Sequence, residues 1–350
     1  MMTIEELVAK AKADGASDIH LIYNLPPKYR ASGQLEDMSD EPLTAEDCIT
    51  YARYLAGSEE AYQAFMDWGE LDAANTYAEN RCRIHIFKQQ GHPSVALRLL
   101  REEIPQLENL GLPPAIMGLT ELHKGIVLVT GETGSGKSTT LAALLDNINH
   151  RFKYHIVTLE DPVEYLYKPD NCAINQREVG KDTKSFSEGL RASLREDPNV
   201  ILIGEMRDRD TIETAITAAE TGHLVFGTLH TGSAADAVDR IVQVFPADAQ
   251  TQIRLQLSMT LNAVLTQQLV PRKGGGRALA AELMIVTDAI RNLIRSGNTP
   301  QIANAVATST AIGGQTMDQA LVKLVRSGAI TKESALHYAH QIDYVKKNAI

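Results

Sequence analysis

Hydrophobic and polar positions at the start of the chain follow the periods of short helices and strands. Apolar side chains first recur at helical spacing, and short stretches then alternate polar with apolar residues, as half-buried strands do. The expected elements are helices over residues 3–14 and 44–66 and strands over residues 17–22, 28–32, 81–88 and 94–100, the last two forming a hairpin. This order predicts a small α/β domain over residues 1–100.

A proline-rich connector over residues 101–114 leads into a region, residues 115–350, in which strands first alternate with helices. Such alternation predicts a parallel sheet covered by helices. The expected strands cover residues 126–130, 155–159, 199–203 and 223–229, and the expected helices cover residues 138–150, 185–195 and 209–221. From about residue 248 to 350 the chain is predicted to be mainly helical, with helices over residues 255–268, 288–295, 315–326 and 332–340 and a hairpin tip at residues 274–276.

Composition narrows the class of protein. The chain has 350 residues, 44% of them hydrophobic and 22% charged, and we expect neither a membrane-spanning helix nor a secretory leader. The net charge of −10 disfavours stable nucleic-acid binding. The three cysteines, Cys48, Cys82 and Cys172, form no C-x-x-C pair, which favours reduced cytosolic thiols and no structural zinc.

The stretch GETGSGKSTT, residues 131–140, follows a β-branched apolar run and matches the phosphate-loop pattern G-x-x-x-x-G-K-[ST]. Its glycines let backbone N–H groups approach a phosphate, and the helix start that follows favours an anion. The pattern places Lys137 at the β and γ phosphates and the Ser138 hydroxyl at Mg²⁺. The expected nucleotide-binding residues are Gly131, Glu132, Thr133, Gly134, Ser135, Gly136, Lys137, Ser138 and Thr139.

Hydrolysis also needs acids that hold the metal and orient the attacking water. The stretch LEDPVEY brings Glu160, Asp161 and Glu164 to the end of a predicted strand, where ligands of α/β sheets bind, although a solvated acidic turn is the alternative. The stretch VILIGEMRD ends another strand and has Gly204 where many phosphate-loop proteins have Asp. This leaves Glu205 as the acid near Mg²⁺, acting through water.

Histidines and arginines complete the candidate site. His223 and His230 stand at opposite ends of one predicted strand, and zinc ligation is disfavoured because no matching Cys or third His is near. His230 falls at the ligand edge of the sheet, where it can sense the γ-phosphate. Arg83, Arg98 and Arg101 are candidates for neutralising charge on the γ-phosphoryl group, although most surface arginines only interact with solvent.

Taken in order, GETGSGKSTT, LEDPVEY, LREDPNVILIGEMRD and AAETGHLVFGTLHT resemble the motifs of the secretion ATPase superfamily, the hexameric motors of type II and type IV secretion and of type IV pili. GASDIHL, NQREVG, DRIVQVFP and AIRNLIR resemble the pilus retraction ATPases in particular, so nearly the whole chain is covered. The resemblance implies a PAS-like first domain and a RecA-like ATPase domain with a helical C-terminal region. It also implies a homohexamer that uses ATP, releases ADP and requires Mg²⁺.

The resemblance further implies a role for each motif. It matches Lys137 and Ser138 to the Walker A motif, Glu205 to the Walker B motif, Glu164 to the catalytic glutamate that polarises water, His223 and His230 to the His box, and Arg83 and Arg98 to the first-domain arginines. Which of these arginines reaches its own nucleotide and which a neighbour's stays open.

The AIRNLIR segment is implied to be a retraction signature that contacts the membrane platform or couples subunits. Its residues are Ala289, Ile290, Arg291, Asn292, Leu293, Ile294 and Arg295. Helical spacing puts Ile290, Leu293 and Ile294 on one face and pairs Arg291 with Arg295, so an ordinary packed helix is the alternative.

Two departures from the family pattern stand out. Glu132 replaces the more usual proline of the phosphate loop, and the chain lacks the long C-terminal extension of accessory retraction ATPases.

The sequence therefore predicts a cytoplasmic ATP-driven motor, peripheral to the inner membrane, that retracts type IV pili and so powers twitching motility. The expected partners are an inner-membrane platform protein and an accessory retraction ATPase. The alternatives are an assembly ATPase of a type IV pilus or type II secretion system, a RecA-type DNA translocase and a non-hydrolysing nucleotide switch. The acidic balance and 5% aromatic content disfavour the translocase.

Overall fold

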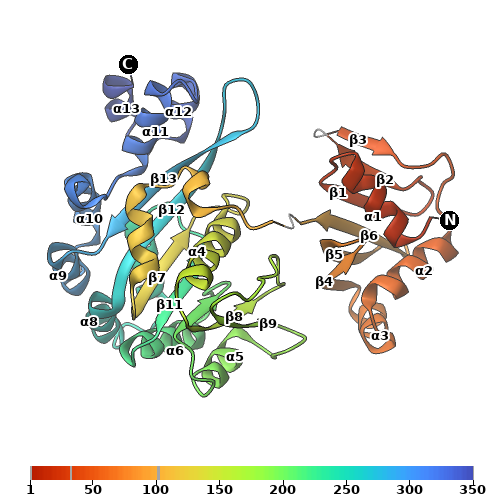
Figure 1. Cartoon of the computed structure of the whole chain (residues 1–350), viewed down its shortest axis with the longest axis horizontal. Helices are drawn as coiled ribbons and strands as arrows, with labels where there is room; N and C mark the ends of the chain where they lie inside the picture. The colour runs from red at the N-terminus through yellow and green to blue at the C-terminus, as the bar shows by residue number, and fades with distance from the viewer. Residues whose placement is uncertain (1, 32–33, 101–102, 350) are drawn as a thin grey trace. The chain divides into compact units, whose positions relative to one another are not determined.

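The structure, a computed structural model, describes residues 2–31, 34–100 and 103–349. The described chain divides into two compact units (Figure 1). The first comprises Met1–Glu103 together with Pro162–Leu166, and the second comprises Ile104–Asp161 and Tyr167–Ile350. Both combine helices with a sheet, so the predicted α/β fold class is confirmed.

The first unit is built on an antiparallel sheet with the strand order β3-β2-β1-β6-β5-β4. Its elements are α1 (Ile4–Ala13), β1 (Asp18–Leu21), β2 (Lys28–Ala31), β3 (Gln34–Asp37), α2 (Ala45–Ala56), α3 (Glu59–Trp68), β4 (Glu70–Tyr77), β5 (Asn80–Gln89) and β6 (His92–Leu99). The predicted first helix, two early strands and hairpin are confirmed.

The helices of the first unit cover one face of its sheet. Leu7 of α1, Tyr51 of α2 and Phe65 of α3 share a buried core with Ile19 of β1 and Ile84 of β5. Because side chains alternate along a strand, the neighbours of Ile84 on β5 point to the opposite face. That face therefore carries Arg83.

The single helix predicted over residues 44–66 is wrong, because the chain breaks it in two. Gly57 ends α2 in the left-handed conformation at φ 81°, which a residue with a side chain adopts only at a cost. Ser58 then starts α3, where its side chain accepts a hydrogen bond from the Ala61 amide at 3.1 Å. Strands β3 and β4 were not predicted.

The second unit holds a sheet with the strand order β13-β12-β7-β11-β10-β8-β9. Its elements are η1 (Leu107–Leu110), η2 (Pro114–Glu121), β7 (Gly125–Thr130), α4 (Lys137–Arg151), β8 (His155–Glu160), β9 (Ala173–Glu178), α5 (Phe186–Ser193), β10 (Val200–Ile203), α6 (Arg209–Glu220), β11 (Leu224–Leu229), α7 (Ala234–Gln243), α8 (Gln250–Thr260), β12 (Leu261–Pro271), β13 (Arg277–Ile285), α9 (Asp288–Ser296), η3 (Thr299–Gln301), α10 (Ile302–Ala307), η4 (Thr310–Ile312), α11 (Met317–Arg326), α12 (Lys332–Tyr338) and α13 (Ile342–Asn348). The strand and helix alternation predicted for residues 126–229 is confirmed.

The neighbouring strands from β12 through β7, β11, β10 and β8 to β9 run parallel, while β13 pairs antiparallel with β12. Ile126 and Leu128 of β7 belong to the core that α6, α7 and α8 cover. Val127 and Val129 alternate to the other face, where α4 contacts β7 (Figure 1). The carboxyl ends of β7, β11, β10 and β8 thus meet at one edge of the sheet.

The predicted helix over residues 255–268 is wrong beyond Thr260. There α8 ends and β12 begins, pairing with β7 and then turning through residues 274–276 into β13. The hairpin tip is confirmed, but it joins two strands of the central sheet. The chain after residue 248 is therefore helical only from α9 onward, apart from α8.

The predicted connector over residues 101–114 also differs from the structure. Residues 101 and 102 lie outside the described residues, and the second unit begins at Ile104. Within it Leu107 is buried, and η1 and η2 both contact α4. The η1 part of this segment therefore contacts the helix that follows the phosphate loop.

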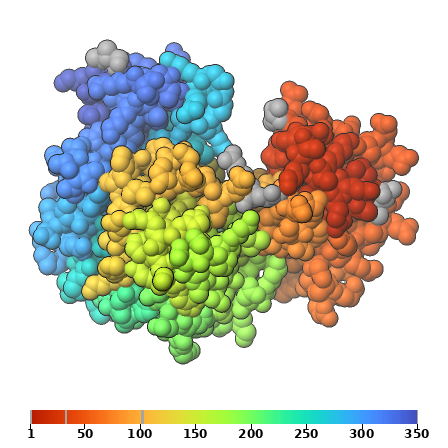
Figure 2. All heavy atoms as spheres, in the orientation of Figure 1, coloured from red at the N-terminus to blue at the C-terminus, as the bar shows by residue number. Residues whose placement is uncertain are grey.

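Two further features concern the chain's C-terminal end and its thiols. Helices α11, α12 and α13 share a small core with Val270 of β12 and Ala278 and Ala280 of β13, and Figure 2 shows the helices in dark blue at the top of the second unit. Cys48, Cys82 and Cys172 are buried free thiols. Burial raises the pKa of Cys48 and of Cys82 to about 11 and also raises the pKa of Cys172.

Candidate active site

The phosphate loop connects β7 to α4 in the conformation that its glycines allow. Gly131, Gly134 and Gly136 have φ of 137°, 81° and 96°, in the left-handed region. A side chain at Gly131 would also place its Cβ against the carbonyl oxygen of Gln267 on β12. Gly136 caps α4 without a side-chain hydrogen bond, and a helix N-terminus of this kind favours an anion.

The side chains of the loop fit a bound phosphate chain. Lys137 Nζ donates to the carbonyl oxygens of Gly131 and Glu132 at 2.8 and 2.9 Å, which holds the ammonium over the loop. Ser135 Oγ is buried and has no hydrogen-bond partner among the described residues. An orphaned buried hydroxyl is costly, so a ligand or water that bonds to it would stabilise the loop. Glu132 is exposed to solvent.

Gly204 allows the acid-bearing strand end to come close to β8. A Cβ at Gly204 would lie 3.0 Å from the carbonyl oxygen of Leu159 and 3.3 Å from the Cα of Glu160, which is tighter than ordinary contact. The position that carries Asp in many phosphate-loop proteins therefore has little room for a side chain here. The acid follows one residue later, as Glu205.

Glu205 is held by an arginine and a histidine at the carboxyl edge of the sheet. Its Oε1 forms an ion pair with Arg207 and accepts a hydrogen bond from His230 Nε2 at 3.1 Å. Burial alone raises the pKa of Glu205, but the hydrogen bonds and charges of Arg207 and His230 outweigh burial and hold it below its ordinary value. The carboxylate is therefore charged at neutral pH.

The other predicted acids divide between the two units. Glu160 ends β8, where its Oε1 accepts hydrogen bonds from Thr158 Oγ1 at 2.6 Å and from Gln176 Nε2 at 3.3 Å. Asp161 follows it in the second unit. The hydrogen bond to Glu205 raises the pKa of Arg207, and the charge of Asp161 adds to this effect. Glu164 lies in the segment Pro162–Leu166, which groups with the first unit.

The two histidines lie at opposite edges of the sheet. His230 follows β11, next to the end of β7, since Leu229 pairs with Thr130. His223 precedes β11 at the far edge, where its Nδ1 donates to the carbonyl oxygen of Ala218 at 2.9 Å. Within one chain, His223 therefore stabilises the end of α6 and has no place beside the phosphate loop.

The arginines of the first unit are neighbours in its sheet. Arg83 on β5 and Arg98 on β6 are register partners. Arg98 Nε is bonded to Asp18 Oδ1 at 2.9 Å, and its side chain remains 64% exposed. Arg101 lies outside the described residues.

The AIRNLIR segment forms most of α9, as predicted. Ile290 and Ile294 are fully buried and Leu293 is partly buried, whereas Ala289, Asn292 and Arg295 face solvent. Arg291 and Arg295 lie four residues apart on α9, as expected, but their side chains have different partners. Arg291 Nη1 donates to the carbonyl oxygens of Ser258 and Met259 at 2.6 and 3.1 Å, at the end of α8, and Arg295 Nη2 donates to Asn292 Oδ1 at 3.1 Å.

A hollow of about 300 Å³ adjoins Glu205 and His230. Arg207 and Arg240 also line it, and sequence reasoning assigned neither to the site. Arg207 stands two residues after Glu205, a spacing that could have drawn attention to it. Arg240 comes from α7 and reaches the site only through the fold.

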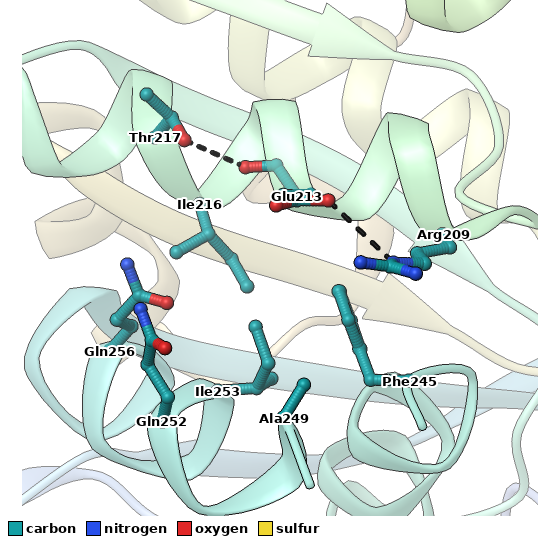
Figure 3. A pocket seen from close by; sticks show the side chains of 9 residues that line it. All are labelled: Arg209, Glu213, Ile216, Thr217, Phe245, Ala249, Gln252, Ile253 and Gln256. Atoms are coloured by element: carbon teal, nitrogen blue, oxygen red, sulfur yellow. Dashed lines mark hydrogen bonds and ion pairs between the residues drawn. The ribbon is translucent and has the colours of Figure 1, made fainter. Parts of the chain in front are cut away.

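A second hollow, of about 200 Å³, lies between α6 and α8 (Figure 3). Ile216, Phe245 and Ile253 form its apolar lining, while Arg209 and Glu213 pair at its rim, 3.7 Å apart. It contains none of the phosphate-loop, acid or histidine residues. We therefore place nucleotide chemistry at the sheet edge and not in this hollow.

A phosphate loop that leads from a buried parallel strand, with an acid and a histidine on the adjoining strand ends, defines a P-loop ATPase. A protein-family model described as type II/IV secretion system protein matches residues 1–275. The chain belongs to this family.

Relatives and solved structures narrow the resemblance. The type IV pilus retractation ATPase PilT of Pseudomonas aeruginosa is 44% identical over 335 residues, which are 95% of this chain and 97% of that protein. The uncharacterized protein YggR of Escherichia coli is 45% identical over 94% of this chain and 100% of that protein. A crystal structure of the pilus retraction motor PilT with bound ADP covers 99% of this chain and 100% of its own, at 44% identity and a TM-score of 0.92.

Within the described residues, no helix is both long enough and apolar enough to span a bilayer.

Proposed function

We propose that this chain is the motor of type IV pilus retraction, a homohexamer that hydrolyses ATP at the inner face of the cytoplasmic membrane. The observation that carries the proposal is the 44% identity to a pilus retractation ATPase over 95% of the chain. The phosphate loop and the Glu205–His230 pair support it, because a motor needs turnover and not nucleotide binding alone. ATP is the substrate, and ADP and phosphate are the products.

The phosphate loop binds the substrate. The amides at the start of α4 and the glycine-rich loop receive the phosphate oxygens, while Lys137 leaves the carbonyls of Gly131 and Glu132 for the β and γ phosphates. The Ser138 hydroxyl and the Glu205 carboxylate, the latter through water, supply the oxygen donors that Mg²⁺ prefers. When bound, Mg²⁺ neutralises charge that develops on the phosphate oxygens.

Other side chains act on the attacking water and the γ-phosphoryl group. Glu164 polarises the water, and His230, bonded to Glu205, senses whether the γ-phosphate is present. Arg83 and Arg98 neutralise charge on the transferred group, from their own subunit or a neighbour. Since Arg98 is bonded to Asp18, it has to leave this partner to do so.

Work comes from a change of conformation that nucleotide binding drives and hydrolysis reverses. The exposed residues of α9, Ala289, Asn292 and Arg295, face a platform protein of the inner membrane or a neighbouring subunit. An accessory retraction ATPase is a further candidate partner. The output is disassembly of the pilus and hence twitching motility.

The test is a count of surface pili on cells that lack the gene, beside wild-type cells and cells complemented with Lys137→Ala. Retraction predicts surplus, immobile pili in the deletion strain and in the Lys137→Ala strain. Bald cells would instead indicate an assembly ATPase of a type IV pilus. An unchanged count would point to type II secretion or another output.

A further inference from the structure

A buried carboxylate in the second unit joins the starts of two helices that are far apart in the sequence. Glu282 of β13 is only 7% exposed. Its Oε1 accepts a hydrogen bond from the backbone amide of Ala234 at 2.8 Å, and its Oε2 accepts one from the amide of Met317 at 3.3 Å. Ala234 is the first residue of α7, and Met317 is the first residue of α11.

The capping side chains of α7 and α11 do not accept hydrogen bonds from these two amides. The capping side chains, Ser233 and Thr316, accept from the third helical residues, Asp236 and Gln319, at 3.1 and 3.3 Å. The first amides are buried with their residues and would remain unpaired without Glu282. Burial raises the pKa of Glu282, and the hydrogen bonds from the Ala234 and Met317 amides offset this only in part.

The first of these helices is tied to the catalytic edge by a short link. Strand β11 ends at Leu229, His230 follows, and α7 begins at Ala234. Pairing with β7 fixes the link at Leu229, and Glu282 fixes it at Ala234. Between these points the His230 side chain is 42% exposed and bonds to Glu205 Oε1.

We propose that Glu282 is a positioning residue for ATP hydrolysis: by anchoring the start of α7, it holds the link that keeps the His230 imidazole on Glu205. The inference rests on the proposed role of His230 in hydrolysis. Glu282 itself touches neither Glu205 nor the phosphate loop by any hydrogen bond of the described residues. Its effect on turnover passes through His230.

The rival explanation is that Glu282 only stabilises the fold, and the chain offers a matched control. Asp318 is also a buried carboxylate, 5% exposed, and also accepts from two backbone amides, those of His340 and Gln341, at 2.9 and 3.1 Å. Both amides belong to the C-terminal helical region and neither leads to His230. Asp318 follows Met317 and its charge acts on Glu282, so the control shares the α11 end of the Glu282 anchor but not the α7 end. A loss of stability alone would therefore appear in variants of either residue.

The experiment measures kcat and KM for ATP in the full-length hexamer with Glu282→Ala, Glu282→Gln, Asp318→Ala, His230→Ala and the Glu282→Ala/His230→Ala double variant. We expect Glu282→Ala to lower kcat about tenfold or more with KM within about twofold, since small misplacement of a reacting group costs rate more than binding. Asp318→Ala should keep kcat within about twofold despite a lowered melting temperature. The double variant should be no slower than His230→Ala, because both changes act through one group.

A second readout follows the imidazole directly. In a ¹H–¹³C spectrum of histidine-labelled protein, with the signal assigned from His230→Ala, the His230 resonance should shift or broaden in Glu282→Ala and stay in place in Asp318→Ala. Glu282→Gln keeps the side chain's size and one acceptor, so it gives an intermediate result and a fallback if Glu282→Ala does not fold.

The proposal is overturned if folded Glu282 variants keep the wild-type kcat or if Asp318→Ala lowers kcat as much as Glu282→Ala does. It is also overturned if the double variant shows the product of the two single-variant reductions in kcat. Full turnover in His230→Ala would instead refute the proposed role of His230. In that case the His230 resonance alone decides whether Glu282 positions it.

Discussion

At position 204 the chain carries glycine where many phosphate-loop proteins carry aspartate, and the surrounding backbone explains the difference. The close approach of Leu159 and Glu160 excludes a side chain there without a shift of β8. The acid is displaced by one residue to Glu205, where His230 and Arg207 keep it charged. The sequence predicted this acid but not its partner Arg207.

Two substitutions separate binding from turnover at the residue scale. Lys137→Ala removes the cation of the phosphate loop and should raise the Kd for ATP at least about 30-fold, the effect of truncating one partner of a close charge pair. Glu164→Gln keeps this cation and should leave the Kd nearly unchanged while kcat falls about 100- to 10,000-fold, the usual contribution of a group that handles a proton. Equilibrium binding of a fluorescent ATP analogue and steady-state ATPase rates measure both.

An undiminished ATPase rate in Glu164→Gln would remove this residue from the mechanism. The comparison is informative because Glu164 belongs to a segment that groups with the first unit, whereas Lys137 belongs to the second.

At the scale of elements, the central strands were predictable and the edge of the sheet was not. Runs such as 126–130 and 199–203 are apolar, β-branched and bounded by glycine or polar residues, which favours buried strands. The run that forms β12 follows α8 without a break and lacks such punctuation, so its hydrophobic pattern fits a helix equally well. Only pairing with β7 and β13 decides between them.

This error hid part of the site's support. Gln267 of β12 is fully buried, and its Nε2 donates to Thr140 Oγ1 in α4 at 2.8 Å. Its backbone oxygen is also the atom that excludes a side chain at Gly131. Because Gln267 was predicted to lie in a helix, its contacts with Thr140 and Gly131 could not be expected from the sequence.

Helix α9 gives a prediction about one element. Arg291→Ala leaves two carbonyls at the end of α8 without their charged donor and should lower the free energy of unfolding by about 1–3 kcal/mol. Arg295→Ala is the control, because its contact stays within α9 at the surface, and should change that free energy by less than about 0.5 kcal/mol. Denaturant unfolding followed by circular dichroism measures the difference.

If Arg291→Ala proves as stable as wild type, the arginine is available for contacts outside the chain. This result would support the interpretation of AIRNLIR as a retraction signature. Pilus retraction should be assayed in Arg295→Ala as well, since this residue faces solvent and its loss does not disturb α8.

At the scale of the whole molecule, the described chain has separate hydrophobic cores in its two units. Family membership and the α/β class could be predicted from the sequence, because the motifs and their order are visible along the chain without the fold. The boundary was harder to predict, since prolines suggested a connector over residues 101–114 whereas Leu107 is buried in the second unit. A proline-rich stretch that contains apolar residues can be part of a domain core, so prolines alone do not identify a linker.

Separate cores predict separate unfolding. Calorimetry should resolve two transitions, and ADP at about 100 times its Kd should stabilise the one that holds the phosphate loop by about 2.7 kcal/mol. Hydrogen exchange of β7 and β11, compared with β5 and β6, assigns the transitions to the units. Lys137→Ala should abolish the shift, and one cooperative transition that moves as a whole would contradict the prediction.

The buried thiols have a practical consequence for watching such a motor turn over. With Cys48, Cys82 and Cys172 inaccessible and, in two cases, with a pKa of about 11, the native surface offers maleimide reagents almost no thiolate at neutral pH. A cysteine introduced at an exposed position such as Arg295 would then carry a fluorophore at a single site per subunit. Neighbouring subunits of the proposed ring could be tracked by energy transfer without first replacing any native cysteine.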